Sequence, residues 1–78
     1  MYYLTKRYFK SEEYTEIETD NSFIFSKIIN NRQLNVVILK VRKQTLYCER
    51  RRINGNYISI GNVRNIKEFK QLILPLLN

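Results

Sequence analysis

The 78-residue chain contains no histidine and a single cysteine, Cys48. Protein zinc sites are built from several cysteine and histidine ligands, and the common catalytic triads need a histidine base, so the sequence indicates neither. With only two glycines, the chain also lacks a glycine-rich phosphate-binding loop. We therefore expect no metal, nucleotide or other cofactor, and a binding protein rather than an enzyme.

One cysteine cannot form an internal disulfide, and no signal peptide is recognisable at the start of the chain. No apolar run approaches the roughly 20 residues that cross a bilayer. These features predict an intracellular protein with no membrane partner. The length predicts one small domain over residues 1–78, and a hydrophobic share of 44% is enough for a core.

Acidic residues are scarce in most of the chain. Five of the seven lie before residue 21, in the segment 12–20. From residue 21 onward, 11 lysines and arginines stand against Glu49 and Glu68, a local net charge of +9. So basic a body suits a polyanion, and nucleic acid is the partner we favour. The acidic segment is either a solvated strand or a cover for the basic surface that DNA displaces.

Runs of β-branched and aromatic residues, separated by turn residues, predict an antiparallel β-meander of three to five strands over residues 14–61. The expected strands are 14–19, 23–29, 34–41, 45–53 and 56–60. Among them LNVVILKV is the most apolar and is expected at the centre of the sheet. Residues 1–13 fit either a short helix or a strand.

A C-terminal helix is predicted over residues 65–77, with Asn65 as its cap and Glu68 completing a capping box. Pro75 should kink or end it, because the ring clashes with the carbonyl four residues back. The apolar ending LILPLL also predicts a homodimer through this helix. Its apolar stripe is expected to pack on the sheet and comprises Ile66, Phe69, Leu72, Ile73 and Leu76. The expected fold is α+β, an antiparallel meander with one C-terminal α-helix on one face.

The dipeptide Asn54-Gly55 is typical of a two-residue type I′ hairpin turn. Such a turn pairs Arg52 with Tyr57 and Arg50 with Ser59. Because side chains alternate along a strand, one face then carries Tyr47, Glu49, Arg51, Ile53, Ile58 and Ile60. The isoleucines assign that face to the core and leave the other face open, with Leu46, Cys48, Arg50, Arg52, Tyr57 and Ser59. A bulge or a longer turn would swap the arginines.

Lys40 and Arg42 join this open face if Val37, Leu39 and Val41 point to the core. The expected DNA-binding residues are thus Lys40, Arg42, Arg50, Arg52, Tyr57 and Ser59. Strands can enter the major groove of double-stranded DNA, where arginines read guanine edges and lysines position the backbone. Alternatively, Tyr57 stacks an unpaired base. Charged residues on the open face of a half-covered sheet are also expected without any ligand, and Tyr57 then only packs across strands.

The segment TLYCERRRINGNYISIGNVRNIKEFKQLI resembles the amino-terminal arm-type DNA-binding domain of phage and integrative-element tyrosine recombinases, most clearly at RRRING and ISIG. The resemblance implies a protein of a phage or mobile element, with a three-stranded sheet in the major groove backed by the helix. It adds Asn56 to the DNA-facing positions Arg50, Arg52, Tyr57 and Ser59. No recombinase catalytic domain follows in this chain, so recombination is not implied.

Other functions remain open. Meander strands followed by ISIGNVRNIKEFKQLI are also similar to the whirly and positive-cofactor single-stranded DNA binders, which dimerise through a C-terminal helix. A small basic endoribonuclease like the RelE-type toxins could use Arg50, Arg52 and Tyr57 without histidine. A small inhibitor that docks on an acidic protein is the last alternative, and double-stranded DNA binding is the leading expectation.

Overall fold

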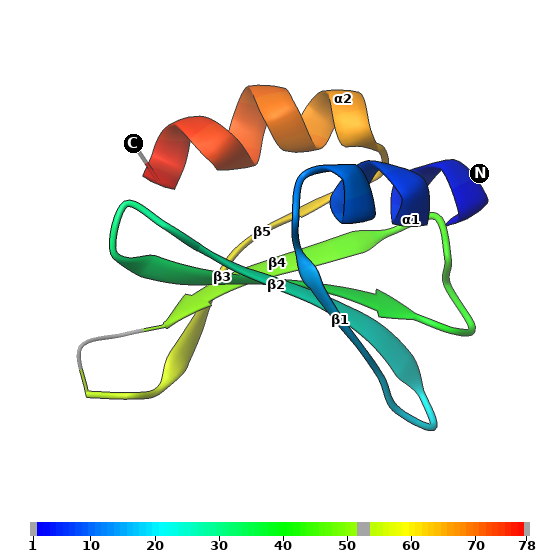
Figure 1. Cartoon of the computed structure of the whole chain (residues 1–78), viewed down its shortest axis with the longest axis horizontal. Helices are drawn as coiled ribbons and strands as arrows, with labels where there is room; N and C mark the ends of the chain where they lie inside the picture. The colour runs from blue at the N-terminus through cyan, green and yellow to red at the C-terminus, as the bar shows by residue number, and fades with distance from the viewer. Residues whose placement is uncertain (1, 52–53, 78) are drawn as a thin grey trace.

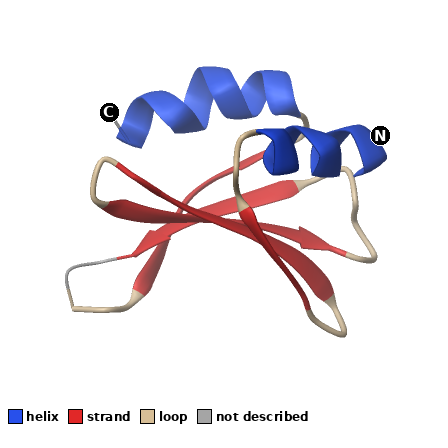
Figure 2. Cartoon of the chain, in the orientation of Figure 1, coloured by secondary structure: helices blue, strands red, loops and turns tan. Residues whose placement is uncertain are grey.

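The computed structural model describes residues 2–51 and 54–77. Five antiparallel strands form one sheet whose spatial order follows the chain, β1-β2-β3-β4-β5 (Figure 1). The helical segments at the two ends of the chain lie on the same face of this sheet and leave the other face uncovered (Figure 2). The expected α+β meander is confirmed, with an N-terminal helix in addition to the C-terminal one.

The strands follow the β-branched and aromatic runs of the sequence. Their bounds are β1 (Thr15–Glu18), β2 (Ser22–Ile29), β3 (Arg32–Leu39), β4 (Leu46–Arg51) and β5 (Tyr57–Val63). A two-residue turn at Asn30 and Asn31 joins β2 to β3, with φ angles of 51° and 64°. Positive φ at both central residues is the type I′ geometry, which asparagine adopts more readily than most residues.

The first helix, α1 (Tyr2–Ser11), takes the place of the segment that fitted either a helix or a strand. It ends in a Schellman motif. The Tyr14 N–H donates to the Phe9 carbonyl at 3.0 Å, and the Glu13 N–H donates to the Lys10 carbonyl at 3.1 Å. Glu13 holds the left-handed position of this motif, with a φ of 67°, where glycine is usual.

The C-terminal helical segment begins as predicted, since the Asn65 side chain accepts a hydrogen bond from the Glu68 N–H at 2.9 Å. The Glu68 carboxylate reaches the Arg64 N–H, also at 2.9 Å, rather than that of Asn65. The segment passes through α2 (Ile66–Glu68), a π-helical turn η1 (Phe69–Ile73) and a 3₁₀ turn η2 (Leu74–Leu77). The change to 3₁₀ geometry comes directly before Pro75, whose ring and missing N–H interrupt α-helical bonding.

The π-helical turn changes which side chains of this segment meet the sheet. A π turn contains more residues than an α turn, so Leu72 turns further from the face shared by Phe69 and Ile73, and the 3₁₀ turn that follows sets the direction of Leu76 and Leu77. Phe69, Ile73 and Leu77 are buried at that spacing, whereas Leu72 and Leu76 are 58% and 54% exposed. The predicted apolar stripe is therefore wrong for Leu72 and Leu76, and it omitted Leu77.

The last turn of the helix is tied to the turn between β2 and β3. The Asn30 side-chain amide donates to the Leu77 carbonyl at 2.8 Å. The Arg32 guanidinium donates to the Leu76 carbonyl at 3.2 Å. Helix C-termini leave carbonyls without intrahelical partners, so these two side chains act as a cap supplied by a distant part of the chain.

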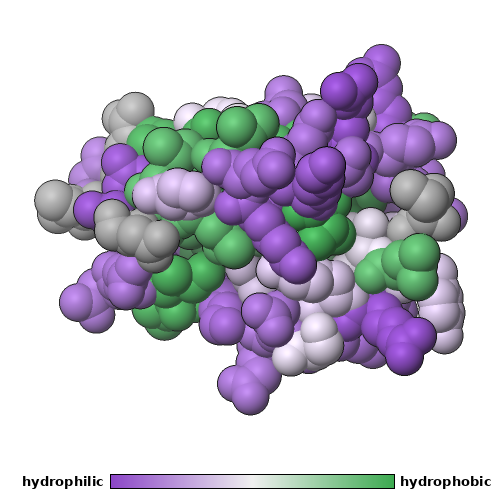
Figure 3. All heavy atoms as spheres, turned by 90° about the horizontal axis from the view of Figure 1, so that it is seen from above, coloured by the Kyte–Doolittle hydropathy of each residue, from purple (hydrophilic) through white to green (hydrophobic). Residues whose placement is uncertain are grey.

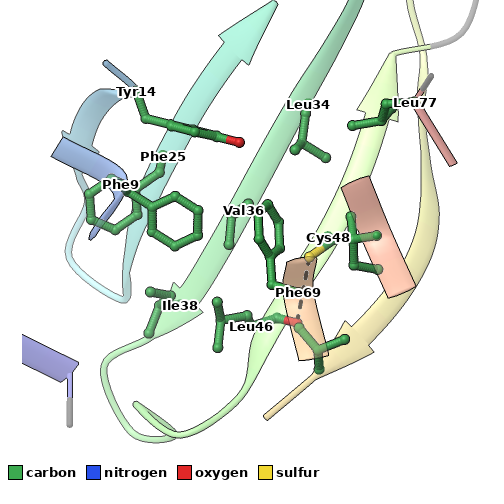
Figure 4. Close-up of a cluster of buried hydrophobic side chains, with 12 residues drawn as sticks. Phe9, Tyr14, Phe25, Leu34, Val36, Ile38, Leu46, Cys48, Phe69 and Leu77 are labelled. Atoms are coloured by element: carbon green, nitrogen blue, oxygen red, sulfur yellow. Dashed lines mark hydrogen bonds between the residues drawn. The ribbon is translucent and has the colours of Figure 1, made fainter. Parts of the chain in front are cut away.

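The core lies between the helices and the covered face of the sheet, and aromatic rings gather at one side of it (Figure 4). The Phe9 ring stacks on Phe25 with centroids 5.0 Å apart and meets the edges of Tyr14 and Phe69 at 4.8 and 5.2 Å. Aromatic pairs at these separations stabilise beyond their buried area. Aliphatic side chains from the two central strands and from the C-terminal segment fill the rest.

The strands β3 and β4 turn the opposite face to the core from the one predicted. Leu34, Val36 and Ile38 of β3 are fully buried, as are Leu46 and Cys48 of β4. The prediction that Val37, Leu39 and Val41 face the core is wrong, as Val41 lies beyond the strand and is 89% exposed. The placement of Tyr47, Glu49 and Arg51 on the core face is also wrong, because these alternate with the buried residues.

The hairpin between β4 and β5 explains the reversal. Arg51 pairs with Tyr57, Arg50 with Ile58 and Glu49 with Ser59, so the register is one residue away from the prediction. A two-residue type I′ turn at Asn54-Gly55 would pair Arg52 with Tyr57, whereas the pairing of Arg51 with Tyr57 requires a longer connection, in which Gly55 has a φ of 91°. The Asn54 side chain instead accepts a hydrogen bond from the Asn56 N–H at 3.1 Å, within a longer loop. Tyr57 and Ser59 lie on the open face, as predicted, because they pair with Arg51 and Glu49 of that face, and a bulge opposite Cys48 and Glu49 shifts the register only beyond these pairs.

Candidate nucleic-acid interface

An open hollow of the described surface lies where two hairpins separate at one end of the sheet. Pairing between β3 and β4 ends at Leu34 and Arg50, and beyond this point the turn at 30–31 lies apart from the described part of the β4–β5 hairpin (Figure 1). The open cleft between them has a volume of about 880 Å³. Its described lining residues are Ile28, Asn30, Asn31, Arg32, Gln33, Arg50, Arg51, Asn54 and Ile58.

Three arginines of the described ranges reach this cleft from different positions on the sheet. Arg32 is the first residue of β3, and its guanidinium is oriented by the Leu76 carbonyl. Arg50 and Arg51 are consecutive on β4, so their side chains leave on opposite faces. Both still line the cleft, because the cleft opens where the pairing of β3 with β4 ends and is reached from both faces of the sheet.

The charge of the cleft is uncompensated within the described residues. No acidic residue lines it in the ranges 2–51 and 54–77, and no ion pair there involves Arg32, Arg50 or Arg51. The acidic residues that form ion pairs in the described ranges lie outside the cleft. Glu16 pairs with Lys6 and Lys10, Glu18 pairs with Lys40, and Glu68 pairs with Arg64. The cleft is therefore a concentrated positive site on a chain with a net charge of +7.

The open face of the sheet next to the cleft is nearly neutral. By strand alternation and register, its charged residues within the described strands are Glu49 and Arg51 alone. Amide and hydroxyl groups form a small network there, since Ser26 donates to the Asn35 side-chain oxygen and Gln33 donates to the same atom at 3.5 Å. The apolar members of this face are Ile17, Ile24, Ile28, Val37 and Leu39, and its two aromatic residues are Tyr47 and Tyr57. The expectation of a strongly basic open face is thus wrong, because the reversed register of β4 leaves only one of its arginines there.

The predicted DNA-binding residues fall into two groups at opposite ends of the sheet. Arg50, Asn56, Tyr57 and Ser59 lie in or beside the hairpin that borders the cleft. Arg52 lies outside the described residues. Lys40 and Arg42 follow the other end of β3, several strand residues away, where the next loop begins. The structure therefore does not bring all the predicted residues together.

Lys40 is already engaged at its end of the sheet. Its ammonium group lies 2.7 Å from the Glu18 carboxylate and 5.1 Å from the centre of the Phe23 ring. The hydrogen bond from Lys40 lowers the pKa of Glu18 below its ordinary value. Arg42 is exposed, and its N–H donates to the Leu39 carbonyl at 2.9 Å within the loop. Glu49 and Arg51 form no ion pair within the described residues.

Two of the three cleft arginines were not expected there. Arg32 falls between the expected strands 23–29 and 34–41, and Arg51 was assigned to the core face. A signal for Arg51 was present in the sequence of β4 itself, because Leu46 and Cys48 alternate with Tyr47 and Glu49. An apolar residue at every second position indicates the buried face, and it places Arg51 on the open one. Arg32 has no such signal, because its position depends on where the C-terminal helix ends.

No protein-family model, curated protein or solved structure matches this chain. The resemblance to the arm-type domain of tyrosine recombinases therefore stays a prediction, as does the similarity to the whirly-type binders. Within the described ranges, no group of three or more acidic, cysteine or histidine side chains is arranged to hold a metal ion. None of the described helices is long and apolar enough to span a membrane.

Proposed function

We propose that this chain binds nucleic acid, with backbone phosphates held in the cleft by Arg32, Arg50 and Arg51. The supporting observation is the convergence of three arginines from two strands in one open cleft whose described lining contains no acid. A guanidinium group presents several donors in a plane and binds phosphate oxygens in pairs, so arginine suits this ligand better than lysine.

A polymer fits the cleft better than a single small anion. The cleft is open to solvent and has room for more than one phosphate group, at about 880 Å³. Its amide side chains, Asn31, Gln33 and Asn54, add hydrogen-bonding groups without charge. Proteins commonly fix a nucleic-acid backbone with such a mixture of arginine and amide contacts. The sequence favours DNA, and we propose DNA as the ligand.

The proposal is of binding without catalysis. The alternative ribonuclease would need Arg50 and Tyr57 at one reaction centre, yet these residues lie on opposite faces of the β4–β5 hairpin. A labelled RNA incubated with the protein is expected to be recovered intact. Appearance of shorter products that depend on Arg50 would support the ribonuclease instead.

The test is a titration of fluorescently labelled single-stranded and duplex DNA across a salt series, followed by anisotropy. Each phosphate contact contributes about 0.7 to the slope of log affinity against log salt for a single strand, so three contacts predict a slope of about −2. Raising salt from 50 to 200 mM should then weaken binding by roughly 20-fold. The double variant Arg50→Ala/Arg51→Ala should bind more weakly, with a slope near −0.7.

The matched control is Arg42→Ala/Lys43→Ala, which removes the same charge from the loop at the far end of the sheet. It should change the affinity and the slope much less than the cleft variant does. Equal losses from both variants would show a general charge effect and would contradict a site in the cleft. If neither form of DNA binds the native protein at low salt, the proposal fails.

The homodimer expected through the C-terminal helix stays a prediction. Leu72 and Leu76 point away from the sheet, and Tyr3 and Leu4 of α1 are also exposed on the helix-covered side. Seen from that side, hydrophobic side chains are interspersed with hydrophilic ones over the surface (Figure 3). Gel filtration of the native chain and of Leu72→Ser/Leu76→Ser is the direct test, and a monomeric native chain would contradict the dimer.

A further inference from the structure

The pairing of Arg51 with Tyr57 places a cation and an aromatic ring side by side on the open face, at the edge of the cleft. Tyr57 is 41% exposed. Resting on the proposed function, we propose that the chain takes single-stranded rather than duplex DNA. In this arrangement a base stacks on the Tyr57 ring, while the neighbouring phosphate lies with the cleft arginines.

The chemistry of the two surfaces matches the two parts of a nucleotide. The cleft is cationic, as a phosphate requires, whereas the adjoining face carries no charged residue of the described strands other than Glu49 and Arg51. Bases are uncharged, flat and rimmed with hydrogen-bonding groups, so they suit an aromatic ring with amides nearby. Gln33 supplies such an amide, since it lines the cleft and also belongs to the open face.

The position of Glu49 favours phosphates in the cleft and bases on the open face. Glu49 stands on the open face two residues from Arg51 and opposite Ser59. Its negative charge repels a phosphate that approaches the middle of the face but has little effect on a neutral base. The backbone is therefore directed to the cleft, and the bases to the sheet.

A duplex fits the same surfaces poorly. Its bases are stacked on one another and its phosphates lie outside, so a duplex laid on the open face would meet Arg51 as the one cation of the described strands there. An unpaired strand can splay its bases onto aromatic side chains, as single-strand binders allow. The cleft and the face together therefore select unpaired DNA.

The experiment compares three ligands of about 12 nucleotides, a length within the usual site size of single-strand binders. They are oligothymidylate, an abasic oligomer with the same number of phosphates, and a duplex of equal length. We expect oligothymidylate to bind the native protein about 10-fold more tightly than the abasic oligomer, because one base stacks on an aromatic ring. It should also bind more tightly than the duplex.

Variants of Tyr57 then assign the preference. Tyr57→Ala should abolish the roughly 10-fold preference for bases and leave the affinity for the abasic oligomer unchanged, whereas Tyr57→Phe should keep the preference. Tyr3→Ala is the control, because Tyr3 is 75% exposed on α1, far from the open face. Circular dichroism confirms that each variant is folded.

The outcomes separate this inference from the function on which it rests. Equal binding of oligothymidylate and the abasic oligomer by the native protein, or tighter binding of the duplex, would overturn the single-strand inference while leaving phosphate binding in place. That comparison needs no substitution, so it holds even if Tyr57→Ala fails to fold. Absence of binding to all three ligands would instead refute the proposed function.

Discussion

Phe9 and Tyr14 pack edge to face across the end of α1, with ring centroids 4.8 Å apart. The two residues are also joined by the 3.0 Å hydrogen bond from the Tyr14 N–H to the Phe9 carbonyl. A hydrophobic contact between these two positions accompanies many Schellman motifs. Here the contact lies where the chain passes from α1 into β1. Glu13, between the two rings in the sequence, holds the left-handed conformation that this change of direction requires.

Replacing Glu13 with glycine should stabilise the protein. A left-handed conformation is costly for a residue with a Cβ atom, and glycine relieves that cost at the expense of a more flexible unfolded chain. We expect a net gain of about 0.5–1 kcal/mol, which for a domain of this size raises Tm by a few degrees. Thermal and urea unfolding measure this gain in stability. Glu12→Gly is the control, because its backbone has no positive φ to relieve, and a gain of the same size there would contradict the explanation.

The turn at Asn30 and Asn31 should respond unequally to glycine at its two positions. Both residues have positive φ, so glycine fits the turn at either one. Asn30→Gly also removes the hydrogen bond to the Leu77 carbonyl, a loss of about 1 kcal/mol. We therefore expect Asn30→Gly to be less stable than Asn31→Gly by about 1 kcal/mol in urea unfolding. Equal stabilities would show that the bond to the helix end contributes nothing.

The Cys48 thiol should be inert in the folded protein and should make stability depend on pH. Cys48 is 1% exposed, and burial raises the pKa of its thiol from 9.0 to about 12. Its contribution to stability is therefore complete below pH 9 and is lost as pH rises from 9 toward 12. The native protein should react with a thiol reagent only as fast as the fold opens and exposes the thiol. The free energy of unfolding of Cys48→Val should fall less steeply with rising pH than that of the native chain. Rapid labelling under native conditions would contradict the burial.

Local sequence patterns were sufficient for the strands and for the start of the last helix. β-branched runs placed β2 and β3 to within two residues, and Asn65 was identified as a cap because its side chain acts on its own next turn. α1 was left open since its tyrosines and Phe9 suit a strand as well as a helix. Only packing of Phe9 against β2 and the C-terminal segment decides between them.

The candidate site was predicted in part, because its arrangement depends on one loop. Asn54-Gly55 is a strong local signal, yet the register is set by the whole hairpin and its bulge, and a shift of one residue exchanged Arg50 for Arg51 on the open face. In β3, Leu34, Val36 and Ile38 alternate with Asn35, Val37 and Leu39, so the two faces of this strand differ clearly only at Asn35, and the amide was a weak signal for the open face. The cleft arises from the divergence of two hairpins, a tertiary feature with no local signature.

The sequential order of the five strands bears on how fast the chain reaches this structure. Each strand pairs with its neighbour in sequence, so every step of sheet formation closes only a short loop. Proteins dominated by such near contacts have low contact order and fold quickly for their class. The contact between Asn30 and Leu77 spans 47 residues and carries the larger entropic cost of closure. We expect the strands of the meander to pair first and the C-terminal segment to pack on them last. Substitutions at Ile73 should therefore mainly accelerate unfolding, whereas substitutions in β2 and β3 should slow folding.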